Sequence, residues 1–559
     1  MSQTSSEVGG CVLGFERFCE ILLDGWSGAS PKPSRTHTVF ALLLAALCVT
    51  VFLIGVVPTY IYGHDDFFLL ENGWRALHGQ RPQLDYWSSW GPVISLVMAF
   101  GLKLAHESAN GIGEANAVVA LVIGSWAYWL GCKRLESRPR VLFALGAALL
   151  TCAPFTLGQS PLLSSHAMTY NRYGYALLSL VLLECLPLRR TTFGDAEELA
   201  GGISTGAVMA IALFLKASFF GASLPLVACS LLFGRRASRW LGLLCGFGLV
   251  AIVFMAYLRF DFIGVFRALR AAAGARSKSL SAVDLWWLIR NHVPAFAGVA
   301  MLGIGATLLK RGARPWIETI QWPLMGLILF VDDIALLATN AQGDALPLLS
   351  IFGLLVAAYL TERRQRSSPA ELLGNLPSHI ILLVLCSSLF LPTLAADVRG
   401  VAVAALHKAR PPVQDCVVHF TVPRLSDLIL CDHPDVLLKS SNGAFYTNSV
   451  SEGAALLGRH AGPADKVLTM DMQNPFPYVL GWAPTTGGMS SSVVNYTFSA
   501  RFRPTPAQYF GDATVVMVPK TPAEDRVFFE PLYAIYGPDL LQRYRLAAEA
   551  GNWLLYRRK

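Results

Sequence analysis

The feature that most constrains this chain is its series of long apolar runs. The first covers residues 38–62, which exceeds the roughly 20 residues that a helix needs to cross about 30 Å of hydrocarbon. A secretory signal has a shorter apolar core, so we interpret this run as an uncleaved first span. Ten further runs follow, at 113–131, 140–157, 168–187, 199–215, 218–234, 240–258, 291–309, 316–338, 345–361 and 378–395. Because 54% of the 559 residues are hydrophobic and only 15% are charged, the sequence predicts an α-helical polytopic membrane protein with about eleven transmembrane helices.

The basic loops predict the orientation. The run 91–105 is ambiguous, because its helix would be only about 22 Å long. If it does not cross, every short basic loop lies on one side, as is typical of cytoplasmic loops. These loops contain Arg17, Lys32, Arg35, the cluster 133–140, Arg189, Arg190, and the stretches GRRASR, KRGAR and ERRQR. We therefore predict a juxtamembrane helix at 91–105, with residues 63–112 and everything after about 396 facing outside. The net charge of +8 then needs no nucleic-acid partner.

Three regions follow from this pattern: a cytoplasmic tail (1–37), a transmembrane domain (38–396) and an extracytoplasmic domain (397–559). The last region is more polar and alternates short apolar runs with helical patterns, which predicts a small α/β domain. It contains only two of the eleven cysteines, Cys416 and Cys431. In an oxidising compartment these two cysteines predict a disulfide.

The first apolar run leads directly into an acidic motif, His64, Asp65 and Asp66, within YGHDDFFLLENGWRALHGQRPQLDYWSSWGP. Apolar residues then recur at helical spacing, which predicts an amphipathic helix on the outer surface, ended by Gly79. Helix capping accounts for one aspartate in a first turn. Two consecutive aspartates, after a histidine and beside aromatic residues, favour a functional site.

This loop resembles the first external loop of GT-C glycosyltransferases, such as the protein O-mannosyltransferases and the lipid A aminoarabinose transferases. The shared features are the first span, the acidic pair, the pattern G-x-x-P-x-x-D-Y ending in Asp85 and Tyr86, and the WGP that follows. The resemblance implies transfer of a sugar from a polyprenyl-phosphate carrier to an acceptor at the outer face. It also implies two juxtamembrane helices and a general base in the acidic motif, with Asp65 the first choice and Asp66 the second. The pair is Asp-Asp here, whereas those relatives have Asp-Glu, so either carboxylate can be the base.

The leaving phosphate gains negative charge and needs cations or a metal ion. Lys216 interrupts an apolar stretch at the outer junction of two predicted spans, where it either meets that need or extends to the membrane surface. Arg172 is a second candidate for the phosphate. His64 is a third, and it could instead orient an aspartate or bind a metal. A divalent metal ion is the only cofactor left open.

Several residues are predicted to bind substrate. Aromatic and polar side chains gather at the head of the run 168–187, although an interfacial aromatic belt explains them as well. Paired carboxylates inside a span are costly unless they face a wet cavity or a cation, and the polar loop that follows them could bind sugar hydroxyls or form a plain turn. The candidates are Asp85, Tyr86, His166, Tyr170, Asn171, Tyr173, Asp332, Asp333, Asn340, Gln342 and Asp344.

We predict an inverting glycosyltransferase in a bacterial cytoplasmic (inner) membrane, using a polyprenyl-phosphate sugar donor and a lipid, polysaccharide or protein acceptor. One alternative is a transporter or flippase that uses the intramembrane carboxylates. Another is a relative without activity that only binds glycans. Nucleotide hydrolysis is not supported, because the sequence has no P-loop and no Gly-rich dinucleotide motif.

Overall fold

The computed structural model describes residues 35–186, 188, 194–233, 237–275, 282–308, 316–340, 342–366, 369–410, 416, 418–432, 443–523 and 526–559. Most of the predicted cytoplasmic tail, Arg189, Arg190 and much of the later basic loops lie outside these residues.

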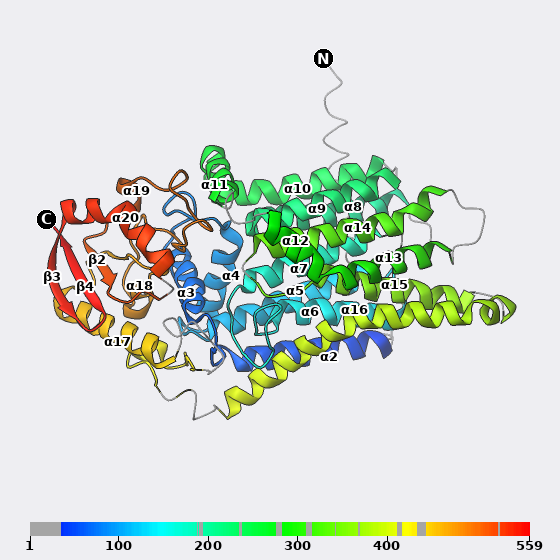
Figure 1. The fold of residues 1–559 in the computed structure, drawn as a ribbon, viewed down its shortest axis with the longest axis horizontal. Helices are drawn as coiled ribbons and strands as arrows, with labels where there is room; N and C mark the ends of the chain where they lie inside the picture. The colour runs from blue at the N-terminus through cyan, green and yellow to red at the C-terminus, as the bar shows by residue number, and fades with distance from the viewer. Residues whose placement is uncertain are drawn as a thin grey trace, which may run out of the picture.

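A bundle of long apolar helices forms most of the molecule (Figure 1). Its helices are α2 (Arg35–Ile54), α5 (Gly111–Gly131), α6 (Ser137–Cys152), α7 (Thr169–Cys185), α8 (Asp195–Leu215), α9 (Ala217–Phe233), α10 (Ala237–Tyr257), α13 (Val293–Leu308), α14 (Trp316–Thr339), α15 (Pro347–Arg366) and α16 (Pro369–Ala409). Every predicted apolar run lies largely within one of them. In the described ranges, five helices are long and apolar enough to cross a membrane. The chain is thus a multi-pass membrane protein, and the count of eleven spans stays a prediction.

The first span ends earlier than predicted. Helix α2 stops at Ile54, and Gly55 adopts φ +60°. A Cβ on Gly55 would lie 2.2 Å from Oδ1 of Asn110, and this oxygen accepts a hydrogen bond from Val56 N (3.1 Å). The prediction of one helix over 38–62 was therefore wrong for its last eight residues, which run without helix to the acidic motif.

Two helices from the first external loop, α3 (Gly63–Leu77) and α4 (Pro92–Leu104), lie between the bundle and the C-terminal domain (Figure 1). Helix α4 confirms the helix predicted at 91–105. Helix α3 is not the surface helix that its periodicity predicted, because residues 63–75 are all buried. The C-terminal domain covers the face that would otherwise meet water, and Trp74 Nε1 donates to Trp482 O (2.9 Å).

The C-terminal domain contains a four-stranded sheet in the order β1-β2-β4-β3. β1 (Val467–Thr469) pairs in parallel with β2 (Val515–Pro519), which pairs antiparallel with β4 (Trp553–Arg558). These three strands lie in short apolar runs of the sequence, whereas the mostly exposed residues of the edge strand β3 (Tyr544–Ala550) form no alternating apolar pattern. The domain's helices are α17 (Gly443–His460), α18 (Phe476–Leu480), α19 (Pro506–Phe510) and α20 (Arg526–Arg543).

Buried polar contacts fix this domain on α3. Arg75 is fully buried, pairs with Glu71 (2.9 Å) and donates to Thr485 O (2.9 Å). The backbone N–H of Asn474 donates to the other oxygen of Glu71 (3.1 Å). In the linker after α16, Cys416 and Cys431 form the predicted disulfide. Because Arg75 and Glu71 of α3 each bond to the C-terminal domain as well as to each other, these contacts hold the domain in a defined position on α3.

Candidate active site

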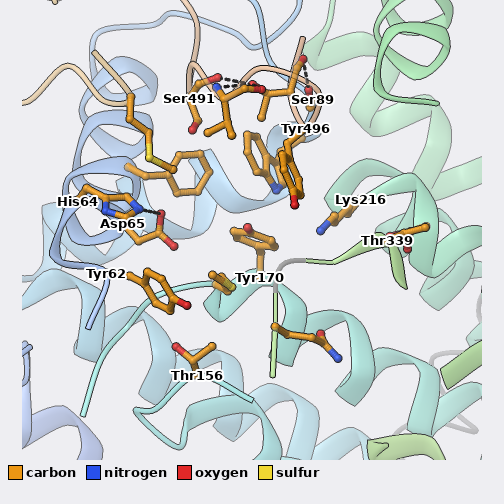
Figure 2. Close-up of a pocket in the computed structure, with 18 of the residues that line it drawn as sticks. Tyr62, His64, Asp65, Ser89, Thr156, Tyr170, Lys216, Thr339, Ser491 and Tyr496 are labelled. Carbon is orange, nitrogen blue, oxygen red and sulfur yellow. Dashed lines mark hydrogen bonds and ion pairs between the residues drawn. The ribbon is translucent and has the colours of Figure 1, made fainter. Parts of the chain in front are cut away.

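A cavity of about 620 Å³ lies where one end of the bundle, α3, α11 (Phe262–Ala275) and the C-terminal domain meet (Figure 2). Its described lining comprises Tyr62, His64, Asp65, Phe68, Ser89, Trp90, Thr156, Gln159, Met168, Tyr170, Lys216, Ala217, Ser218, Leu269, Ala273, Thr339, Gln342, Gly343, Met472, Ser491, Val493, Tyr496 and Thr497. The structure thus brings His64 and Asp65 of the acidic motif together with Lys216, Tyr170 and Gln342 around one cavity.

Asp65 lies in the first turn of α3, with its carboxylate at the cavity wall (Figure 2). His64 Nε2 lies 3.4 Å from Asp65 Oδ1. Burial lowers the pKa of His64 to about 3, so its ring is neutral at physiological pH. A neutral His64 ring brings no positive charge to a phosphate, so its contact with the donor phosphate stays a prediction. Its position matches the alternative, in which it orients Asp65.

Asp66 is completely buried and does not belong to the described lining. It accepts a hydrogen bond from Thr59 Oγ1 (2.7 Å), and Thr59 in turn exchanges backbone hydrogen bonds with Ile429 and Cys431, beside the disulfide. Burial raises the pKa of Asp66 to about 7. The carboxyl group of Asp66 therefore faces protein at the start of α3 and not the cavity, and its role as the base stays a prediction.

Asp66→Asn is expected to remove a pH dependence of stability. The folded-state pKa of Asp66 is raised, so its contribution is complete below the unfolded pKa of about 4 and is lost as pH rises through about 7. His64, with its lowered pKa, acts oppositely and loses stability as pH falls below about 6.5. Asparagine keeps an oxygen for Thr59. Between about pH 5 and pH 8 the free energy of unfolding of the wild type should fall by about 3 kcal/mol relative to that of the variant. The measurement is the Tm of both purified proteins at the two pH values. An equal Tm difference at both pH values would contradict this prediction.

Lys216 stands in extended backbone (φ −163°) between α8 and α9, as predicted for the junction of two apolar runs. Its Nζ donates to Asn171 Oδ1 (3.1 Å) and lies 4.8 Å from the centroid of the Tyr170 ring. The ring of Trp90 packs against Tyr170 at 5.4 Å. Asn171 thus holds Lys216, while Tyr170 and Trp90 present aromatic surface to the same cavity.

Three neighbouring candidates are buried outside the cavity lining. Arg172 pairs with Asp397 of α16 (3.0 Å) and donates to Phe155 O (2.9 Å). His166 Nε2 accepts from Val57 N (3.3 Å), and Tyr173 donates to Asn116. The polar groups of Arg172, His166 and Tyr173 thus join helices and loops to each other. Their predicted contacts with phosphate and sugar are not part of the described cavity.

Arg172→Met is expected to destabilise the protein by about 3–5 kcal/mol, because Asp397 keeps a buried charge without its partner. Asp397→Asn in addition should recover part of this loss. Thermal unfolding of the two variants and the double variant measures the effect. Additive losses would contradict the pairing.

The side chains of Asp85 and Tyr86 bond to their own loop and to α3, and they lie outside the described lining of the main cavity. Tyr86 is buried, donates to Asn72 Oδ1 (3.3 Å) and lies under the Arg75 guanidinium (4.6 Å). Asp85 accepts from Arg81 N (2.7 Å) and borders a separate hollow of about 250 Å³. Tyr86 borders the same hollow, and the contact of both residues with substrate stays a prediction.

The carboxylates of α14 also lie outside the described lining. Asp333 accepts from the backbone N–H groups of Leu348 (3.3 Å) and Leu349 (2.9 Å), so it caps α15. Asp332 is buried on the same helix, and Asp344 is exposed with His292 at 3.9 Å. Their contact with substrate stays a prediction, and none of the three lies in the described lining of the cavity. Asn340 is buried and is not in the lining either.

The roof of the cavity comes from the C-terminal domain, which sequence reasoning missed. Ser491, Val493, Tyr496 and Thr497 line it, and Figure 2 shows Tyr496 and Ser491 opposite Tyr170. Ser89 Oγ donates to Thr497 O (2.9 Å), which ties the roof to the first external loop. Because about 400 residues separate the two segments, no sequence pattern signals their meeting.

The described residues contain no group of three or more His, Cys, Asp and Glu side chains placed to hold a metal ion. His64 and Asp65 are the cavity's nearest approach to such a set.

No family model matches the chain, and no curated protein matches its sequence. Among solved structures, ArnT from Cupriavidus metallidurans bound to undecaprenyl phosphate aligns with a TM-score of 0.50 and 14% identity, over 93% of this chain and 98% of that one. The same protein in the apo state gives 0.44. The archaeal oligosaccharyltransferase AglB from Archaeoglobus fulgidus, in complex with an inhibitory peptide and a dolichol-phosphate, gives 0.38 at 10% identity, over 94% of this chain and 75% of that one.

The architecture defines a multi-pass membrane protein with a cavity between its helices and a C-terminal α/β domain. Its fold is the GT-C fold of membrane glycosyltransferases, as the sequence resemblance predicted.

Proposed function

We propose that this protein is a GT-C glycosyltransferase that moves a sugar from a polyprenyl-phosphate carrier to an acceptor hydroxyl. The observation that carries the proposal is one cavity with a carboxylate, Asp65, and an ammonium, Lys216, in its wall. Such transfer needs a base for the acceptor and a cation for the leaving phosphate. The likeness in fold to a protein solved with undecaprenyl phosphate supports the choice of carrier.

In this mechanism the Asp65 carboxylate takes the proton of the acceptor hydroxyl as its oxygen bonds to the anomeric carbon. The bond between that carbon and the phosphate oxygen breaks, and its electron pair stays on the phosphate. The new negative charge is stabilised by Lys216, whose ammonium Asn171 holds. A single displacement inverts the anomeric configuration. His64 acts through Asp65 as a positioning residue.

Helix α11 provides a route for the carrier's tail. Leu269 and Ala273 line the cavity, while Phe262, Ile263 and Phe266 on the same helix are exposed. An exposed apolar face on an amphipathic helix suits the membrane surface. The carrier's phosphate then enters the cavity while its chain stays in lipid. We place the cavity on the outer face of a bacterial cytoplasmic membrane, following the basic loops.

The test is turnover of purified protein with radiolabelled polyprenyl-phosphate sugars and a membrane extract as acceptor. Label should pass into lipid, polysaccharide or protein, and slow hydrolysis should occur without acceptor. If no carrier binds and no sugar is released from any of them, the proposal fails. Uptake into liposomes, coupled to protons, would then support the transporter alternative.

A further inference from the structure

The side of the cavity near the α14–α15 connection is formed by two loops in close contact. Gly343 N donates to Leu157 O (2.8 Å), and a Cβ on Gly158 (φ +76°) would lie 2.2 Å from the backbone carbon of Gly343. Only glycine permits both that φ and that approach. The contact sets Thr156 and Gln342, one from each loop, in the lining of the same cavity.

Both residues carry a buried oxygen without a hydrogen-bond partner among the described residues: Thr156 Oγ1 and Gln342 Oε1. Thr156 is 1% exposed. The other end of the Gln342 amide, Nε2, donates to Tyr175 OH (2.9 Å), which fixes the amide's orientation and leaves Oε1 as an acceptor. Buried polar atoms without partners destabilise a protein. A ligand whose hydroxyl groups bond to Thr156 Oγ1 and Gln342 Oε1 therefore gains binding free energy from these hydrogen bonds.

The charges of the cavity restrict the ligand further. Within the described lining, Asp65 and Lys216 are the ionic side chains, since His64 is neutral. The proposed reaction uses both of them, one at the acceptor hydroxyl and one at the phosphate. The remaining polar lining consists of hydroxyls and amides. The described lining offers no second carboxylate for the ammonium of an amino sugar and no second cation for the carboxylate of a uronic acid, and burying either charge unpaired is costly.

We propose that Thr156 and Gln342 form a hydroxyl-binding subsite and that the donor sugar is neutral, with hydroxyls but no charged group. This inference rests on the proposed function and specifies its substrate.

The experiment compares polyprenyl phosphates that carry a neutral hexose, a neutral pentose, an aminopentose or a uronic acid. One of the neutral carriers should exceed both charged ones at least about tenfold in kcat/KM, because each charge would be buried without a partner. Preferred turnover of a charged sugar would overturn the inference and leave the proposed function standing. Absence of turnover and binding with all four would overturn both.

Two variants test the subsite. Thr156→Val should raise KM about fivefold with little change in kcat, as expected for one lost hydrogen bond. Gln342→Glu should shift the ratio of aminopentose to neutral turnover toward the aminopentose about tenfold, since it adds the missing carboxylate. The matched control is Thr151→Val, a buried threonine whose hydroxyl bonds Ala147 O (2.8 Å) within α6. An unchanged ratio in folded Gln342→Glu, or equal effects of the two threonine variants, would overturn the subsite.

Discussion

Asp65→Asn is expected to lower sugar transfer about 10²–10⁴-fold while carrier binding changes little. Asparagine keeps the size of the side chain and a polar group near His64, but it cannot accept the proton of the attacking hydroxyl. The loss should therefore appear in kcat, with the KM for the carrier nearly unchanged. Initial rates with radiolabelled carrier at saturating acceptor measure the effect.

Two matched variants separate a lost base from a lost structure. Asp85→Asn removes a carboxylate from the same loop but from outside the main cavity, and it should keep activity. Asp66→Asn should keep kcat per folded molecule and change only the stability, because Asp66 faces Thr59. If folded Asp66→Asn protein has no activity while Asp65→Asn remains active, the base has been assigned to the wrong aspartate.

The sequence located the acidic pair, but its preference for Asp65 over Asp66 came from the family resemblance and not from the local pattern of residues. Adjacent residues on a helix point in directions about 100° apart, so one of two aspartates can face a cavity while the other faces protein. Which one does so depends on where the 55–62 segment and the disulfide-bonded loop pack. Asp66 meets Thr59 from that segment, and this contact is not visible in the local sequence.

The apolar runs predicted the helices well, because burial in lipid or protein requires apolar composition along the whole helix. Their ends were less predictable. α2 ends at Ile54, because Asn110, which lies 55 residues beyond Gly55, closely approaches Gly55. Similarly, the periodicity of α3 showed a helix with a polar face, but not that Glu71 and Arg75 would be buried under another domain.

Several predicted site residues lie outside the described lining of the cavity for a common reason. Polar residues at helix ends in a membrane protein often satisfy neighbouring polar groups, because unpaired ones are costly there. Arg172 meets Asp397 and Asp333 caps α15. Each looked functional in isolation, since the sequence does not show the partner. Lys216 differs, because its side chain reaches the cavity that also contains Asp65.

Lys216→Met is expected to weaken carrier binding about 10- to 100-fold, with a fall in transfer of at least that size. A hydrogen bond from an ammonium to phosphate stabilises the complex by about 1.5–3 kcal/mol, and it strengthens as the leaving phosphate gains charge. Methionine fills a similar volume, so the packing against Tyr170 should persist. Lys216→Arg should retain much of the binding, because it keeps the charge.

Direct binding of fluorescent polyprenyl phosphate, without any sugar, isolates the phosphate from the rest of the reaction. Lys216→Met should lose this affinity, and raising the salt concentration should weaken the wild type more than the variant. Lys103→Met, which removes an exposed lysine from the last turn of α4, is the control for general surface charge. Equal losses in Lys103→Met and Lys216→Met would mean that the membrane surface, and not the cavity, attracts the carrier. Unchanged affinity in Lys216→Met would remove the phosphate-binding role, and the leaving group would then need another cation.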